Sequence, residues 1–366
     1  MDLSIAHLVH MALVLGLAAQ TNAYWVLGCG KPVAVERLDP IVSPKTISSH
    51  AHSIMGGNAF DWDLDYNRTQ TSTCTTCGVS KDLSNYWVPK VYFHAGNGSY
   101  ISVEQIGGVN VYYQQRMDWT EEKARKKIQP FPPGLRMLAG DPDRRTYNAS
   151  MSEHRAIEFD CIPANGDRGR DPTGGFPSNT SCLGGLQIRV RFPSCWDGKN
   201  VNSRDHRSHV AYPSGMDNGA CDGDHPVRIM ALLYETTWAI DRFDALRKPG
   251  DQPFVVSNGT NSDPTGYGWH ADFLNGWDTE LLRAAINDTA TCGDSAGGVI
   301  DRCAPLKPYL LTADEQKACP ALASRVDEQV DGVLSALPGA AAASTMVVNI
   351  PAPTANAARR RLRRVW

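Results

Sequence analysis

The sequence predicts a mostly β fold, an antiparallel β-sandwich or jelly-roll-like single domain with long disulfide-tied loops and a few short helices. Three observations lead to this prediction. Turn-forming residues recur throughout the stretch from Cys29 to Cys303, the runs between them are short and rich in aromatic and β-branched residues, and ten cysteines are available to cross-link the connections. Such a chain buries its apolar faces by stacking or closing antiparallel sheets.

Four runs are predicted to be strands. The clearest is 186–192, where apolar side chains occupy every second position and polar side chains the positions between them. This alternation is typical of a strand with one buried face. The other predicted strands are at 86–93, 109–113 and 253–257, each bounded by turn residues.

Helices are expected to be few. Residues 119–128 are charged enough to form a short surface helix, and 278–286 forms a better one because Asp278 is placed to cap it. The run from Thr312 to Glu315 has the form of a capping box, so a helix is predicted to start there. A further helix is expected from Pro320 to Leu334, since apolar residues recur in it at helical spacing.

Composition divides the chain into four parts. Residues 1–23 are predicted to be a secretory signal peptide, because the apolar run 8–19 is too short to span a bilayer and ends near the small residue Ala23. A buried N-terminal helix is the alternative, since no Lys or Arg precedes the run. Residues 24–310 are predicted to be the β-rich domain, 311–336 a C-terminal helical extension, and 337–366 a disordered basic tail.

The cysteines and sequons support export to an extracellular or cell wall-associated location. All ten cysteines follow residue 23, which suits up to five disulfides whose pairing stays open at this point. The spacing of Cys74 and Cys77 also suits a redox or zinc pair, but no second such pair is present, and a structural bridge is expected. Six sequons predict a glycoprotein, at Asn67, Asn97, Asn148, Asn179, Asn258 and Asn287.

Charge and motif content exclude several classes of function. The formal net charge is −3, which argues against a nucleic-acid partner. No later run is apolar for long enough to predict a membrane span, and the chain is expected to act as a monomer. It lacks the Walker A loop, the dinucleotide-binding glycine motif and the H-E-x-x-H zinc motif.

The first candidate site is the pair His50 and His52. Residues two apart on extended backbone point to the same side, so both imidazoles can converge on one ligand. Such a pair is suited to binding substrate or a divalent metal ion. The alternative is a pair hydrogen-bonded into a loop.

The second candidate site lies in the segment 192–213, which holds Trp196, Asp205 and His209. A carboxylate beside an imidazole can act as an acid or base, with the imidazole orienting the proton. The alternative is a polar staple within a loop.

The third candidate site lies in the segment 263–278. His270 and Asp272 are again two apart, and Trp269 and Trp277 flank them. Aromatic planes beside carboxylates are a common way to hold and cleave sugar rings. For each tryptophan the alternative is packing in the core.

Several motifs together are similar to those of the DUF1996 family, which comprises secreted proteins found mainly in fungi. The resemblance covers about residues 30–305 and includes Ser-Ser-His-Ala-His, Gly-Gly-Val-Asn-Val-Tyr-Tyr, Phe-Pro-Ser-Cys-Trp-Asp-Gly-Lys-Asn, Asp-His-Arg-Ser-His-Val-Ala-Tyr-Pro and His-Ala-Asp-Phe-Leu-Asn-Gly-Trp-Asp. It implies that these motifs belong to one domain and implies no catalytic residues, because the family is uncharacterised. The stretch 257–266 carries extra residues, and a glycan on Asn258 there would lie near His270.

These features favour a secreted carbohydrate-active protein, a polysaccharide hydrolase or lyase. In this hypothesis Asp205 or Asp272 serves as acid or base, and His209 and His270 orient or share the proton. The expected substrate-binding residues are His50, His52, Trp196, Trp269 and Trp277. No cofactor is expected beyond a divalent metal ion. The alternatives are a non-catalytic protein that binds cell-wall glycan, and a secreted metal-binding protein with His50, His52 and a third histidine as ligands.

Overall fold

The structure is a computed structural model that describes residues 23–340, except for residues 125, 164–168, 171–173, 179–180, 249, 260–261 and 294–296. The predicted signal peptide lies outside the described residues up to residue 22, and the predicted tail lies outside them from residue 341. Within the described residues, no helix has the length and apolar character needed to cross a membrane.

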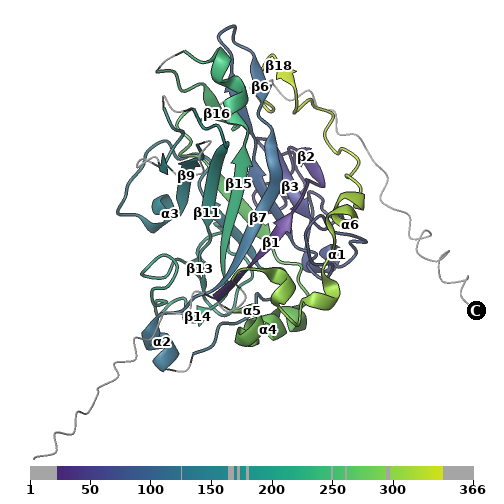
Figure 1. The fold of residues 1–366 in the computed structure, drawn as a ribbon, viewed down its shortest axis with the longest axis vertical. Coiled ribbons are helices and arrows are strands. Elements are labelled where there is room, and N and C mark those ends of the chain that lie inside the picture. Colours follow the sequence, from purple (N-terminus) through teal and green to yellow (C-terminus); the bar gives the residue numbers. More distant parts are fainter. Residues whose placement is uncertain are drawn as a thin grey trace, which may run out of the picture.

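Two antiparallel sheets form the body of the protein (Figure 1). The larger sheet contains, in spatial order, β1 (Ala23–Cys29), β7 (Gln105–Gln115), β15 (Ala231–Trp238), β11 (Leu186–Arg191), β9 (Ile157–Cys161) and β10 (Gly169–Arg170). The second contains β2 (Ala34–Glu36), β3 (His52–Gly56), β4 (Asn85–Pro89), β17 (His270–Leu274) and β8 (Arg136–Gly140). Buried side chains of both sheets form one apolar cluster, in which Tyr86 of β4 packs against Tyr234 of β15. The prediction of a mostly β fold is confirmed.

Two smaller sheets and several short helices complete the fold. The smaller sheets contain β16 (Phe254–Val256), β5 (Val91–His94), β6 (Tyr100–Ser102) and β18 (Val333–Leu334), and then β13 (Val210–Ala211), β12 (Cys195–Trp196) and β14 (Val227–Arg228). The α-helices are α1 (Tyr66–Thr69), α2 (Trp119–Lys123), α3 (Ser152–Arg155), α4 (Thr279–Asn287), α5 (Thr289–Cys292) and α6 (Ala313–Ala318). Three 3₁₀ turns are η1 (Ile240–Leu246), η3 (Ile300–Arg302) and η4 (Lys307–Tyr309).

The strand predicted from strict alternation is β11. Its apolar residues Leu186, Ile188 and Val190 are buried between the sheets, as a period of two requires. Its arginines point to the other face, where Arg191 pairs with Glu158 of the neighbouring strand β9. The predicted strand at 86–93 divides into β4 and β5 at Lys90.

The predicted helix caps are present. Asp278 accepts hydrogen bonds from the backbone N–H of Glu280 and Leu281 at the start of α4. Thr312 and Glu315 cap each other's backbone at the start of α6, which is the reciprocal pattern of a capping box. The predicted helix at 119–128 is shorter than expected and ends at Lys123.

The prediction of a second helix in the C-terminal extension is wrong. Residues 320–332 form no helix, and β18 pairs with β6 instead. The carboxylate of Glu36 accepts hydrogen bonds from the backbone N–H of Arg325 and Val326, so groups that a helix would use are bound to the β-domain. The start of the predicted tail is also ordered, since Leu337 is buried. We call residues 320–340 the C-terminal strap.

Five disulfides use all ten cysteines. The pairs are Cys29–Cys77, Cys74–Cys319, Cys161–Cys182, Cys195–Cys221 and Cys292–Cys303. Cys74 and Cys77 bond to different partners, so they form neither a redox pair nor a zinc pair with each other. The Cys74–Cys319 bridge attaches the strap region to the loop before β4 across 245 residues of sequence. Such a bridge restricts the unfolded chain more than a short loop does.

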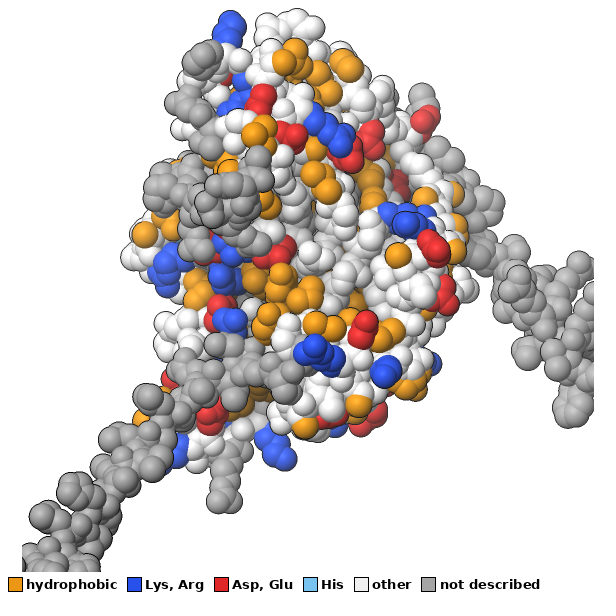
Figure 2. All heavy atoms as spheres, in the orientation of Figure 1, with side chains coloured by type: hydrophobic (Ala, Val, Ile, Leu, Met, Phe, Trp, Pro, Cys, Tyr) orange, Lys and Arg blue, Asp and Glu red, His pale blue; other side chains and the backbone are white. Residues whose placement is uncertain are grey.

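The outer face of the five-stranded sheet is covered rather than open to solvent. A second apolar cluster lies on it, made by Ile54, Trp87 and Leu274 of the sheet with Leu38 and Val326 of the loop and the strap that cover them. On the face seen in Figure 2, in contrast, basic and acidic side chains are interspersed and gather into no single basic patch. The candidate site lies beneath the covering of the five-stranded sheet.

Candidate metal centre

Strand register brings two of the predicted histidines together. His52 of β3 pairs with Pro89 of β4, while Asp272 of β17 pairs with Trp87 of the same strand β4. His270, two residues before Asp272, therefore lies at the level of His52, on the other side of β4. Side chains alternate along a strand, so His270, Asp272 and His52 all face the covered outer side.

The third histidine comes from the turn before β3. The Nε2 atoms of His50 and His270 lie 3.0 Å apart, although 220 residues separate them in sequence. The His50 ring also lies 4.3 Å from that of His52, measured between centroids. One ring nitrogen from each of the three histidines lies within 4.8 Å of the others. Tertiary structure thus supplies the third histidine that the metal-binding hypothesis needed.

Backbone carbonyls fix the tautomers of two rings. Nδ1 of His52 donates to the carbonyl of Leu38 at 2.9 Å, and Nδ1 of His270 donates to that of Gly268 at 3.0 Å. A carbonyl accepts but cannot donate, so each Nδ1 carries the proton and each Nε2 carries a lone pair. Metal-binding histidines are commonly oriented in this way by an acceptor on the second ring nitrogen.

His50 is held by a hydroxyl that can serve either tautomer. Its Nδ1 lies 2.9 Å from Oγ of Ser49. Because Nε2 of His270 carries a lone pair, Nε2 of His50 donates to it, and Nδ1 of His50 then accepts from Ser49. A hydroxyl can both donate and accept. When a cation binds between the rings, the proton on Nε2 of His50 can thus be replaced by one on its Nδ1.

The three rings are neutral because they are buried. Burial lowers the pKa of His50 well below its usual value, with further lowering from His52, His270 and Arg37. Burial also lowers the pKa of His52 well below its usual value, and electrostatic repulsion from His270 lowers it further. Burial also lowers the pKa of His270 to about 4. Neutral imidazole is the form that binds a metal ion.

The arrangement fits a transition-metal ion. Tetrahedral zinc with Zn–N bonds of about 2.0–2.1 Å places its nitrogen ligands about 3.3 Å apart. The nitrogen atoms of His50 and His270 are 3.0 Å apart, which is close to that value. The other two nitrogen–nitrogen distances are within 1.5 Å of it. Nε2 of His52 is buried and has no hydrogen-bond partner in the described part of the chain, as expected for a lone pair reserved for a cation. Three histidines leave a fourth position for water or substrate.

Asp272 is the most unusual group beside the histidines. It is fully buried, and neither carboxyl oxygen has a hydrogen-bond partner among the residues that the structure describes. Burial raises the pKa of Asp272 well above its usual value, Asp39 adds to the rise, and Arg207 opposes it. Buried polar groups without partners are costly and are found mainly where function needs them. Asp272 is therefore part of the candidate site, on the same face of β17 as His270.

Asp205 and His209 lie elsewhere and are hydrogen-bonded within their own loop and to β8. One oxygen of Asp205 accepts from the hydroxyls of Ser203 and Ser208 and from two backbone N–H groups, which lowers the pKa of this exposed carboxyl. His209 is buried and bonds Ser203 Oγ through Nδ1 and the carbonyl of Arg136 through Nε2. These contacts make the two residues a staple within their loop, the alternative considered for this cluster. The two residues do not join the histidine cluster.

The three tryptophans do not form a stacking platform. Trp269 and Trp277 are fully buried in the core between the sheets. Nε1 of Trp277 donates to the hydroxyl of Tyr113, which lies 2.6 Å from that of Tyr86, and Tyr86 donates to the carboxylate of Asp82. Trp196 is half-buried and donates to the carbonyl of Asn200. The expectation that Trp269 and Trp277 contact a substrate is thus not met by this structure.

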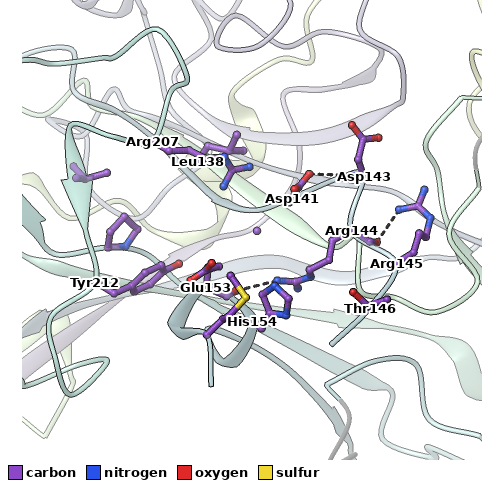
Figure 3. Close-up of a pocket in the computed structure, with 14 residues that line it drawn as sticks. Leu138, Asp141, Asp143, Arg144, Arg145, Thr146, Glu153, His154, Arg207 and Tyr212 are labelled. Atoms are coloured by element: carbon purple, nitrogen blue, oxygen red, sulfur yellow. Dashed lines mark hydrogen bonds between the residues drawn. The ribbon is translucent and has the colours of Figure 1, made fainter. Parts of the chain in front are cut away.

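A pocket lies beside the strand that carries His270, and Figure 3 shows the residues that line it. Its volume is about 700 Å³, and Leu138 and Gly140 of β8 line it. These two residues pair with Asp272 and His270 respectively, so the strand that lines the pocket is the direct neighbour of the strand that carries His270. None of the charged residues that line the pocket was predicted as a site residue. Arg207 alone had a sequence signal, because it lies between His206 and His209 in a motif already singled out.

Comparison with known proteins gives one match. A family model described as a domain of unknown function, DUF1996, matches residues 39–277. No curated protein matches the chain, and no solved structure matches it. The matched region contains all three histidines, Asp272 and the residues that line the adjoining pocket.

Proposed function

Since the chain belongs to the DUF1996 family, whose function is unknown, we propose a function from the site itself: the protein is an exported metalloprotein that binds one divalent transition-metal ion through His50, His52 and His270. The observation that carries this proposal is the convergence of three neutral imidazole nitrogens, two of them freed for a metal by backbone acceptors. Zinc and copper suit an all-imidazole site better than calcium or magnesium do.

Export, N-glycosylation and a monomeric state are part of the same proposal. Five disulfides support export, because such bonds persist in oxidising compartments. Four sequon asparagines are exposed and available to a glycosyltransferase, namely Asn67, Asn97, Asn148 and Asn287. Asn258 is different, since it is largely buried and its amide nitrogen donates to the carbonyl of Pro142.

Metal content tests the proposal directly. The full chain, secreted from a eukaryotic host, is stripped with a chelator, incubated with Zn²⁺ or Cu²⁺, desalted and measured by plasma mass spectrometry. We expect about one ion per chain, lost in His52→Ala and in His270→Gln. His94→Ala is the matched control, because His94 is exposed and stacks on Tyr100 away from the cluster.

The outcome is decided by stoichiometry together with folding. Circular dichroism checks that each variant keeps its β-sheet signal, so that loss of metal is not loss of fold. If the folded wild type retains neither zinc nor copper after desalting, the metalloprotein proposal is wrong. Retention of the ion by folded His270→Gln would place the metal elsewhere.

A carbohydrate-active enzyme is the second proposal, and one observation favours it. The pocket beside the histidine cluster has the volume of a small-ligand site and carries carboxylates, arginines and a histidine. The acid–base roles first expected of Asp205 and His209 are not part of this version, because both ring nitrogens of His209 and one oxygen of Asp205 already hold their loop together. Soluble oligosaccharides released from a panel of wall polysaccharides, read by mass spectrometry with and without chelator, would establish a metal-dependent enzyme.

A further inference from the structure

Three arginines line the pocket beside the metal centre, and they differ in how their side chains are bonded. Arg144 donates to the carbonyls of Tyr267 and Glu153, and Arg145 donates to the carbonyl of Pro142. Both therefore brace the pocket wall. The guanidinium of Arg207 makes no hydrogen bond or ion pair with any residue in the part of the chain that the structure describes, although its backbone N–H is bonded.

The loop that carries Arg207 is built to hold it in place. Asp205 accepts a hydrogen bond from the backbone N–H of Arg207 itself, at 3.1 Å. His206, just before it, has a positive φ of 58°, which is uncommon for a residue with a side chain. His209, just after it, fixes the loop to β8 through the carbonyl of Arg136. The Asp205–His209 staple thus positions a free guanidinium beside β8, and rigid presentation of a binding group lowers the entropic cost of binding.

Two further groups face the pocket with bonding capacity to spare. Nδ1 of His154 accepts the backbone N–H of Asn148 at 2.8 Å, so the proton of the neutral ring is on Nε2, which can donate. The carboxylate of Glu153 has no bonded partner among the residues that the structure describes. Figure 3 shows Glu153 and His154 on the side of the pocket opposite Arg207.

We propose that this pocket binds a hexuronic acid unit, the carboxylate-bearing sugar of acidic polysaccharides, with Arg207 as the partner of its carboxylate. The planar guanidinium offers paired donors that match a carboxylate. The hydroxyl groups of the sugar meet an acceptor in Glu153 and a donor in His154. Asp205 and His209 are positioning residues for Arg207. This inference concerns ligand class and stands apart from the metal proposal, although the bound sugar would lie one strand away from the metal centre.

Calorimetric titration tests the ligand class. The full chain, in metal-free and zinc-loaded forms, is titrated at low salt with trigalacturonate, with the neutral trisaccharide of galactose, and with inorganic phosphate. We expect binding of trigalacturonate, at least tenfold weaker binding of the neutral sugar, and weaker binding as salt is raised. Equal binding of the neutral sugar, or displacement of trigalacturonate by equimolar phosphate, would overturn the proposal.

Charge-matched variants test the assigned cation. Arg207→Gln is expected to weaken trigalacturonate binding at least tenfold, and Arg207→Lys to restore part of it. Arg204→Gln makes the same charge change three residues earlier on the same loop, at an exposed position, and is expected to stay within twofold of wild type. Asp205→Asn should weaken binding less than Arg207→Gln, with partial recovery at higher ligand concentration, as a positioning role predicts. Equal losses in Arg204→Gln and Arg207→Gln would refute the assignment to Arg207.

The sugar titration and the metal measurement test the two proposals separately. Sugar binding by a protein that retains neither zinc nor copper in the desalting measurement would leave the pocket proposal standing and refute the metalloprotein proposal. Bound metal without sugar binding, in folded protein, would do the reverse.

Discussion

Replacing Asp272 with leucine is expected to make the metal-free protein more stable. Leucine has the same number of side-chain heavy atoms and the same branching as aspartate. Asp272 lies between Trp87 and Leu138 on neighbouring strands, and its two carboxyl oxygens are buried without partners. Removing an unsatisfied buried polar group recovers about 1–3 kcal/mol.

The expected change in melting temperature follows from the size of the described chain. An unfolding entropy of about 2.1 cal/mol/K per residue gives roughly 0.7 kcal/mol/K for residues 23–340. A gain of about 2 kcal/mol therefore raises Tm by about 3 °C. The same variant should bind zinc about 10–100-fold more weakly, because a carboxylate next to the ligands is lost.

Differential scanning calorimetry in chelator and zinc titration form the paired assay. Higher stability with weaker metal binding is the signature of a group kept for function at the expense of stability. Asp272→Asn is the matched control, since it keeps the shape and removes only the ionisable group. If Asp272→Leu lowers Tm in chelator, Asp272 has a partner such as a buried water, and the reasoning from its unsatisfied oxygens is refuted.

Three further predictions concern stability and processing. Burial raises the pKa of Asp82 from 3.8 to about 6, so its protonated form favours the fold: this contribution is full below pH 3.8 and is lost as pH rises through 6, by about 3 kcal/mol. Denaturant unfolding of Asp82→Asn from pH 4 to 7 should lack that loss, and parallel curves for variant and wild type would contradict the assignment. Mass spectrometry of glycopeptides should find Asn258 unmodified and Asn67 occupied, since the amide of Asn258 is bonded within the fold; full occupancy at Asn258 would contradict this. Paired Cys74→Ala and Cys319→Ala changes should loosen the C-terminal strap, seen as faster proteolysis there than in the wild type, and no change would show that its non-covalent contacts, those of Glu36 and Arg37 among them, hold it without the bridge.

Local patterns were sufficient where an element depends on its own residues. The alternation in 186–192 predicted β11, because a strand with one buried face needs a period of two. Asp278 and the pair of Thr312 and Glu315 predicted helix starts, because caps bond to backbone within three residues. The helix expected at 320–334 failed for a tertiary reason, since Glu36 binds the backbone of that segment from far away in sequence.

The candidate site was only half visible in the sequence. His50 and His52 share a face because they are two residues apart, and the same spacing joins His270 to Asp272. That both pairs meet depends on β3 and β17 both pairing with β4, a contact between residues 220 positions apart that no local pattern encodes.

What the sequence determined by itself was the class of fold, its caps and the use of cysteines for disulfides. Tertiary structure decided which polar residues gather. It brought His270 to His50, buried Trp269 and Trp277 in the core, and turned Asp205 and His209 into supports for Arg207. The physical reason is range: hydrogen bonds of caps and strand alternation act between near neighbours, whereas a site forms where distant strands pair and exclude water.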